Sequence, residues 1–119
     1  MDKITTQQFF SKGFKKVGEN DWTYKGDKPC VIDFYADWCA PCKSLDIMLK
    51  DISKNYNNVN FYKVNVEEEY ELTELLNITS IPLIIIVSKS YNPVILSGTI
   101  SRSKLESCIK SVSMENTIA

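Results

Sequence analysis

Hydrophobic and polar positions alternate along the chain in segments that predict a mixed α/β fold. Two runs, residues 30–36 and 83–87, are almost entirely apolar, which is typical of strands buried on both faces of a sheet. Residues 59–66 alternate in strand fashion, and a turn at residues 91–93 leads into a returning strand over residues 94–97. The pattern therefore predicts a sheet built around two central strands.

Other segments carry apolar residues at helical spacing. They cover residues 5–16, residues 40–54, the stretch after the acidic residues 67–69, and a last stretch beginning near Leu105. Their apolar positions are Phe9, Phe10, Phe14 and Val17; Leu45, Met48, Leu49 and Ile52; Leu72, Leu75 and Leu76; and Leu105, Cys108, Ile109 and Val112. The predicted order is α β β α β α β β α. Strands joined through helices predict a mixed sheet with helices on both faces.

Length and composition narrow the class of protein. The chain has 119 residues, of which 44% are hydrophobic and 24% charged, and no repeat or Pro/Gly/Ser-rich linker divides it. Residues 1–119 are therefore predicted to form a single soluble domain. A formal net charge of -1 argues against a nucleic-acid-binding groove. No run approaches the about 18 apolar residues of a membrane span. Residues 1–8 lack the apolar region of an export signal, so a cytoplasmic location is expected.

The candidate chemistry lies in two closely spaced cysteines. The chain has no histidine, which excludes Cys-His and Ser-His nucleophile pairs. Cys39 and Cys42 stand where a predicted strand ends and a helix begins, and cysteines three apart on a first helical turn can form a disulfide. The helix N-terminus stabilises a thiolate, most strongly at Cys39, which is the expected nucleophile. Pro41 fits the first turn and stiffens the short ring.

Two structural explanations compete with a redox role. A closed zinc site needs four ligands, whereas Cys30 and Cys108 are single, distant and unaccompanied by histidine, so no metal site is predicted. Inert core thiols would lie within an apolar stripe, but Cys39 and Cys42 flank a proline at the start of a helix. Cys30 and Cys108 do lie in such apolar runs and are assigned to core packing.

Asp33 interrupts an otherwise apolar strand, where burying an ionised carboxylate is costly. It could instead be a strand-edge or turn residue. It lies three residues, roughly 10 Å, before the end of the strand, and the following helix returns Cys42 about 4.5 Å toward it. Asp33 is therefore expected nearer Cys42 than Cys39, where a buried carboxyl with a raised pKa could exchange a proton with Cys42. Lys63, in the next strand, is its candidate charged neighbour.

The segment VIDFYADWCAPCK, from Val31 to Lys43, resembles the active-site segment of thioredoxins. The resemblance extends from about Pro29 to about Val112, in the family's order and approximate spacing, through residues 63–66, 80–82 and 97–98. It implies a three-layer fold with a central mixed five-stranded sheet flanked by four helices. It also implies a cis peptide at Ile81-Pro82 facing the cysteines, although proline is also an ordinary first residue of a strand.

The resemblance further implies a general protein-disulfide reductase. The Cys39 thiolate would attack a substrate disulfide, and Cys42, deprotonated with the help of Asp33, would resolve the mixed disulfide. The chain lacks a dinucleotide fingerprint, so no bound cofactor is expected, and NADPH and flavin would belong to a partner thioredoxin reductase. The other expected partners are disulfide-containing substrate proteins. The protein is expected to be a monomer and to bind neither nucleic acid nor membrane. The implied substrate-docking surface comprises Trp38, Ala40, Pro41, Ile81, Pro82 and Gly98.

Three departures from the family pattern fall where partners are contacted. Ala40 replaces the usual glycine, Thr79-Ser80 replaces the common Arg-Gly or similar pair, and Leu83 replaces the usual threonine. The choice of substrate therefore does not follow from the resemblance. Two alternative functions are a thiol oxidant or isomerase of an exported compartment, and a non-enzymatic binding subunit. The absence of an export signal argues against the first, and the presence of both cysteines and Asp33 argues against the second.

Overall fold

A five-stranded mixed sheet forms the centre of the computed structural model, which describes residues 1–19, 21–90 and 92–115. Its strand order is β1-β5-β4-β6-β7; β1, β5 and β4 are parallel, and β6 is antiparallel to both β4 and β7. The elements are β1 (Asp2–Lys3), α1 (Thr6–Ser11), β2 (Phe14–Lys16), β3 (Trp22–Tyr24), β4 (Cys30–Tyr35), α2 (Ala40–Ser53), β5 (Asn60–Asn65), α3 (Tyr70–Leu75), β6 (Leu83–Val87), β7 (Val94–Ser97) and α4 (Arg102–Glu115). The expected five-stranded sheet with four helices is confirmed.

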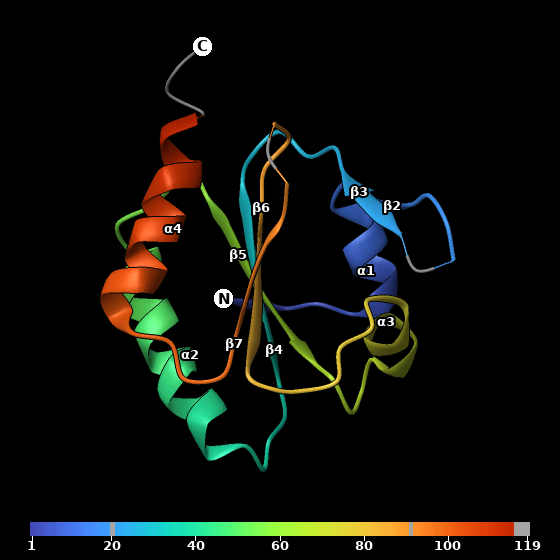
Figure 1. The fold of residues 1–119 in the computed structure, drawn as a ribbon, viewed down its shortest axis with the longest axis horizontal. Coiled ribbons are helices and arrows are strands. Elements are labelled where there is room, and N and C mark those ends of the chain that lie inside the picture. The colour runs from blue at the N-terminus through green and yellow to red at the C-terminus, as the bar shows by residue number, and fades with distance from the viewer. Residues whose placement is uncertain (20, 91, 116–119) are drawn as a thin grey trace.

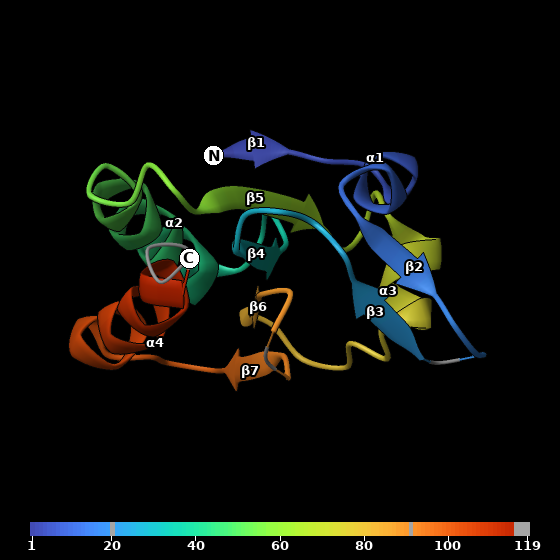
Figure 2. The same ribbon diagram turned by 90° about the horizontal axis from the view of Figure 1, so that it is seen from above.

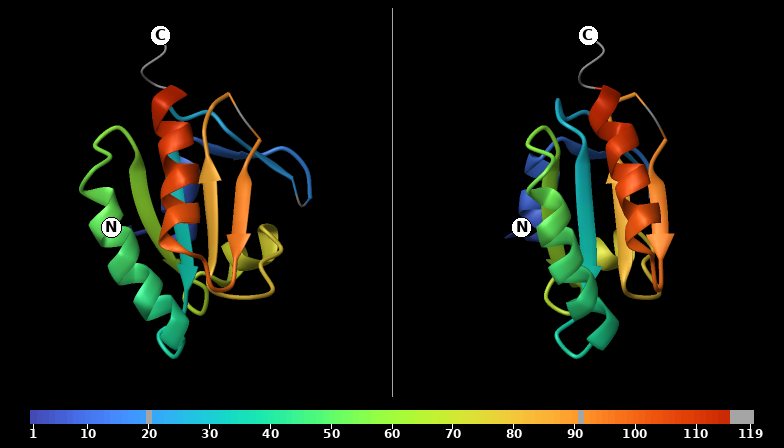
Figure 3. Two further views of the ribbon diagram at one scale, coloured as in Figure 1. Left: turned by 60° about the vertical axis from the view of Figure 1, so that its left-hand side comes forward. Right: turned by 90° about the vertical axis from the view of Figure 1, so that its left-hand side faces the viewer.

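Helices cover both faces of this sheet. Figures 1 and 2 show α2 and α4 on one side, and α1, α3 and the β2–β3 hairpin on the other. Figure 3 shows α2 and α4 lying across the same face of the sheet. Each side has its own buried apolar cluster, so the fold has three layers and two cores.

The central strand β4 contributes to both cores because successive side chains point to opposite faces. Cys30, Ile32 and Phe34 belong to the core beside α1 and α3, whereas Val31 belongs to the core beside α2 and α4. The same alternation places Asp33 on the side of α2. In β5, Phe61 packs against the α2–α4 core, so Lys63 shares that face. The fold thus brings Asp33 and Lys63 beneath the helix that begins after Cys39.

The helix predicted over residues 5–16 is wrong beyond Ser11. Gly13 has a φ of 101°, a left-handed conformation that ends the helix and favours glycine. Phe14 then begins β2, which pairs with β3 in an antiparallel hairpin, and its ring stacks on Phe9 at a centroid distance of 4.0 Å. Val17, expected on the apolar stripe, is exposed. The predicted order of elements also lacks β1 and one strand of this hairpin.

Other sequence-based predictions have mixed outcomes. Cys30 is fully buried and Cys108, half-buried on α4, packs against the α2–α4 core, which confirms both packing assignments. The turn expected at residues 91–93 includes Tyr91, which lies outside the described residues. Within the described ranges, no helix combines the length and apolar character needed to cross a membrane.

Candidate active site

Cys39 and Cys42 form a disulfide at the start of α2, with their Cα atoms 5.2 Å apart. Cys39 is the N-cap of the helix, and its Sγ accepts a hydrogen bond from the backbone N–H of Cys42 at 3.3 Å. Pro41 occupies the first turn, where the helix does not need its missing N–H. The structure therefore confirms the pairing and the place of the cysteines at a helix N-terminus.

Burial does not distinguish the two cysteines as nucleophiles. The exposed fraction is 4% for Cys39 and 2% for Cys42. The N-cap position favours Cys39, because in the reduced protein its sulfur would receive a backbone N–H and lie at the positive end of the helix dipole. Trp38, which precedes Cys39, is 69% exposed, and its role in docking stays a prediction.

The peptide bond between Ile81 and Pro82 is cis, as the resemblance implies. Ile81 packs against the small cluster formed by Ala36, Cys39 and Cys42, so the bond lies next to the disulfide. The backbone N–H of Gly98 donates a hydrogen bond to the Pro82 carbonyl at 3.0 Å, and the φ of Gly98 is 77°. This contact joins the end of β7 to the start of β6.

An apolar pocket of about 250 Å³ adjoins the disulfide. Three of the expected docking residues, Pro41, Pro82 and Gly98, line it together. Of the other three, Trp38 and Ala40 are exposed and Ile81 packs against the cysteines. Five further lining residues were not predicted as docking residues, and they are Ser44, Leu45, Met48, Thr99 and Ile100. These residues were missed because each also fits the apolar stripe or polar flank of an ordinary helix or loop.

Asp33 is completely buried in β4, and neither of its carboxylate oxygens has a hydrogen-bond partner among the described residues. Burial raises its pKa to about 7; the nearby Asp46 carboxylate adds to the rise, and Lys63 opposes it. The expected raised pKa is therefore supported, and an edge or turn location is excluded. That Asp33 lies nearer Cys42 than Cys39 stays a prediction.

Lys63 lies directly opposite Asp33 in the parallel register of β4 and β5, and its charge acts on Asp33. Its ion-pair partner, however, is Asp46 of α2, whose Oδ1 lies 3.7 Å from the Lys63 Nζ. Lys63 also lies over the Tyr35 ring, 5.3 Å from the centroid. Sequence reasoning missed Asp46, although its place four residues after Cys42 puts both on one helical face.

A second pocket, of about 460 Å³, is lined by both Asp46 and Lys63 and by the expected resolving cysteine, Cys42. It is lined by Tyr35, Ala36, Asp37, Cys42, Lys43, Asp46, Ile47 and Lys63. Because Cys42, Lys63 and Asp46 share this pocket, solvent that enters it can reach all three. Asp33 is not among the residues that line this pocket.

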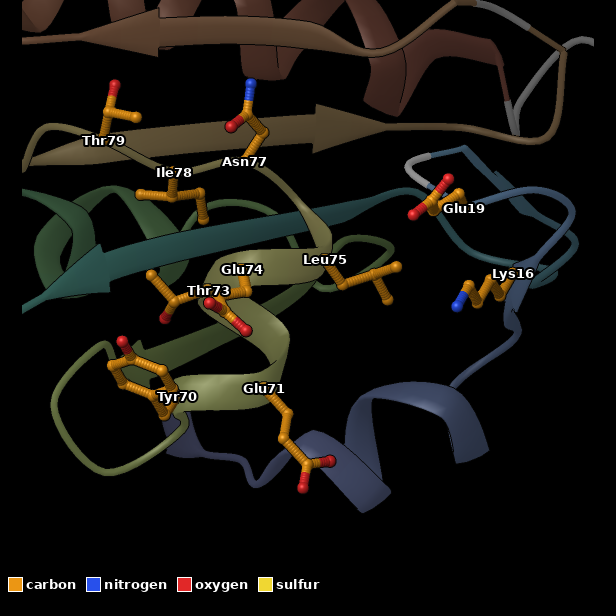
Figure 4. Close-up of a pocket in the computed structure, with 10 residues that line it drawn as sticks. All are labelled: Lys16, Glu19, Tyr70, Glu71, Thr73, Glu74, Leu75, Asn77, Ile78 and Thr79. Atoms are coloured by element: carbon orange, nitrogen blue, oxygen red, sulfur yellow. The ribbon is translucent and has the colours of Figure 1, made fainter.

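A third pocket, of about 720 Å³, lies elsewhere. Figure 4 shows its side chains coming from α3, from the loop that follows and from the segment around Lys16 and Glu19. It shares no lining residue with the two pockets at the cysteine pair. Among the described residues, there is also no group of three or more acidic and cysteine side chains that could hold a metal ion.

The sequence matches the thioredoxin family model over residues 11–111. The chain belongs to the thioredoxin family. A thioredoxin of Borreliella burgdorferi is 33% identical over 108 residues, which cover 90% of this chain and 92% of that protein. Thioredoxin 1 of Plasmodium falciparum is 46% identical over 82 residues, or 69% of this chain and 70% of that protein. The crystal structure of a Malassezia sympodialis thioredoxin is 28% identical, with a TM-score of 0.76 over 95% of this chain and 90% of that one.

Membership of the thioredoxin family indicates which reaction the disulfide takes part in. Thioredoxins are thiol-disulfide oxidoreductases, and this member carries the C-x-x-C pair as a disulfide at the start of α2. It is therefore a protein-disulfide reductase that works by dithiol-disulfide exchange through Cys39 and Cys42.

Proposed function

We propose that the protein is a general cytoplasmic thioredoxin, in which residues 1–119 work as a single domain and as a monomer. The observation that carries this proposal is the Cys39–Cys42 disulfide at the start of α2, with the cis Ile81-Pro82 bond next to it and a buried carboxyl in the preceding strand. The protein binds no cofactor of its own. Its electrons come from NADPH through a flavin-containing thioredoxin reductase, as a role in electron transport requires.

The reaction begins with the reduced protein. The Cys39 thiolate attacks one sulfur of a substrate disulfide, forms a mixed disulfide and releases the other substrate sulfur as a thiolate that takes a proton. Asp33 accepts the proton of Cys42, directly or through one water, and Lys63 adjusts the charge around Asp33. The Cys42 thiolate then attacks Cys39, the bond to the substrate breaks, and the substrate leaves fully reduced. The two electrons given to the substrate leave a Cys39–Cys42 disulfide.

The substrate is held by the apolar surface around the disulfide. Pro41, Pro82 and Gly98 line the pocket beside it, and Trp38, which precedes Cys39 in the sequence, is exposed. An extended segment of an unfolded or flexible substrate suits this shallow surface, because its backbone can approach Gly98 without meeting a side chain. Nothing lies within 4 Å of where a Cβ would stand at Gly98.

The first prediction concerns the reduction potential of the Cys39–Cys42 pair. A cytoplasmic reductant needs a potential at or below about -220 mV, the upper end of the cytosolic glutathione poise. Equilibration in defined thiol-disulfide buffers, followed by counting of alkylated thiols, measures it, and the Cys39→Ser/Cys42→Ser variant gives the baseline. A potential near about -120 mV, that of a strong oxidant, would contradict the proposal and favour a thiol oxidant of an exported compartment.

The second prediction concerns Asp33→Asn. We expect resolution of a mixed disulfide to slow on the order of 100-fold, at the lower end of what a positioned general base contributes, while the initial attack by Cys39 changes little. Rapid-mixing kinetics with a chromogenic disulfide separates the two steps. Equal slowing of both steps would show that Asp33 does not serve Cys42 in particular.

A further inference from the structure

Asp46 lies where it can control the charge around Asp33. It follows Cys42 by one helical turn, and both residues line the pocket of about 460 Å³ together with Lys63. Its Oδ2 lies 3.0 Å from the Lys50 Nζ, and its Oδ1 lies 3.7 Å from the Lys63 Nζ. That second oxygen is buried and makes no hydrogen bond within the described residues. The carboxylate is thus anchored by Lys50 and turned toward Lys63.

Two carboxylates, those of Asp33 and Asp46, are candidate ion-pair partners of Lys63. It lies opposite Asp33 in the sheet, yet its ammonium pairs with Asp46, and Asp33 is left without a hydrogen bond. The side chains of Lys63 and Asp46 are each 24% exposed, so their attraction is screened less than that of a fully exposed pair. An ion pair with Asp33 instead would stabilise the charged form of that carboxyl and make it a weaker base.

We propose that Asp46 is a positioning residue for the resolving half of the reaction: it holds the Lys63 ammonium at the pocket, away from Asp33, so that Asp33 stays a good proton acceptor for Cys42. The inference rests on the proposed role of Asp33 and adds a residue that the family resemblance did not supply. Asp46 itself exchanges no proton with the cysteines. It acts through Lys63 and through its own negative charge.

The charges that act on Asp33 are those of Asp46 and Lys63, and the other titratable groups of the neighbouring elements lie around this pair. On α2, Lys43 lines the same pocket and Lys50 is already paired with Asp46. From β4 and the loop after it come Tyr35 and Asp37, and β5 supplies Lys63. On the other flank of β4, the residue opposite Asp33 is the apolar Ile84. Arg102 of α4 is engaged with Asp51 and Glu106.

The test is a pH titration of Asp33 in the reduced Asp46→Asn variant, in which the ionisation is observed by NMR of the carboxyl carbon. We expect the midpoint of Asp33 to fall by at least about half a pH unit, because a neighbouring negative charge is lost and Lys63 is released toward Asp33. The pH profile of mixed-disulfide resolution should move in the same direction, and the rate of initial attack by Cys39 should not change. An unmoved Asp33 midpoint would overturn the inference.

Asp51→Asn is the matched control. It removes the same charge from the same helix, but Asp51 pairs with Arg102 and does not line the pocket. In this variant, the titration midpoint of Asp33 should match that of the unaltered protein. If the midpoint falls as far as it does in Asp46→Asn, the effect is one of general charge and the inference is overturned.

The route through Lys63 has its own test. In a Lys63→Met background, Asp46→Asn should move the Asp33 midpoint by less than half as much. An undiminished shift would overturn the role of Lys63. If Asp33→Asn resolves mixed disulfides at the normal rate, the proposed role of Asp33 fails, whereas the titration still reports separately whether Asp46 controls this carboxyl.

Discussion

The Cys39→Ser variant is expected to lose protein-disulfide reduction by about 1,000-fold or more, because a hydroxyl at the helix N-terminus cannot replace a thiolate as nucleophile. The measurement is reduction of a disulfide-bonded test protein with dithiothreitol as electron donor, corrected for the reaction of dithiothreitol alone. Cys108→Ser is the control: this cysteine is half-buried on α4 and makes no disulfide, so activity should be retained.

The matching change at Cys42 has a different expected result. Cys42→Ser still attacks through Cys39 but cannot resolve the product, so a mixed disulfide should accumulate and be visible by mass spectrometry as a stable covalent adduct. Adduct formation by Cys39→Ser instead would reverse the two roles. Biological activity retained after both cysteines are replaced would point to the non-enzymatic binding subunit.

Asp33→Asn should stabilise the folded protein at alkaline pH by on the order of 3 kcal/mol. The pKa of Asp33 is about 7 in the folded protein, against an ordinary value of 3.8. Between these values the folded state binds a proton that the unfolded state has released, so stability falls as the pH rises through this window. Well below pH 3.8 the carboxyl is neutral in both states and makes no such contribution, and at pH 4 the contribution is still small. A neutral amide of similar size avoids this loss.

Urea denaturation at pH 4 and pH 8 checks this prediction. The unaltered protein and Asp33→Asn should differ little at pH 4, and the variant should be the more stable of the two at pH 8. Asp51→Asn serves as control, because Arg102 lowers the pKa of this exposed carboxyl and its removal should bring no gain at pH 8. A stability difference that is the same at both pH values would mean that the ionisation of Asp33 is not its cause.

The predictions succeeded where several physical signals agreed. Residues 30–36 and 83–87 became β4 and β6 because long apolar runs have no alternative to burial within a layered fold. The helix after Cys39 combined an apolar stripe with proline in the first turn. In residues 5–16, the spacing of Phe9 and Phe14 suggested one helix, but α1 ends before Gly13 and Phe14 lies on β2, where its ring stacks on Phe9. Only tertiary packing decides between these outcomes.

The candidate site was predictable to the extent that its residues looked unusual in their sequence context. Asp33 stood out in an apolar strand, and the cysteines stood at a boundary between strand and helix. Asp46 did not stand out, because an acidic residue between Leu45 and Ile47 on a helix ordinarily faces solvent. Its role depends on the pairing of β4 with β5, which brings Lys63 beneath α2. Such long-range pairing is not visible in local sequence.

Side chains of β4 point alternately into the two cores, and this also limits which insertions and deletions of residues the strand tolerates. A residue gained or lost between Cys30 and Asp33 would turn Asp33 toward the core of Phe9 and Phe14, and an apolar neighbour would take its place beneath α2. Such a protein could keep its cysteines and lose the base that serves them. Insertions and deletions in this strand should therefore be selected against for catalysis as strongly as for folding.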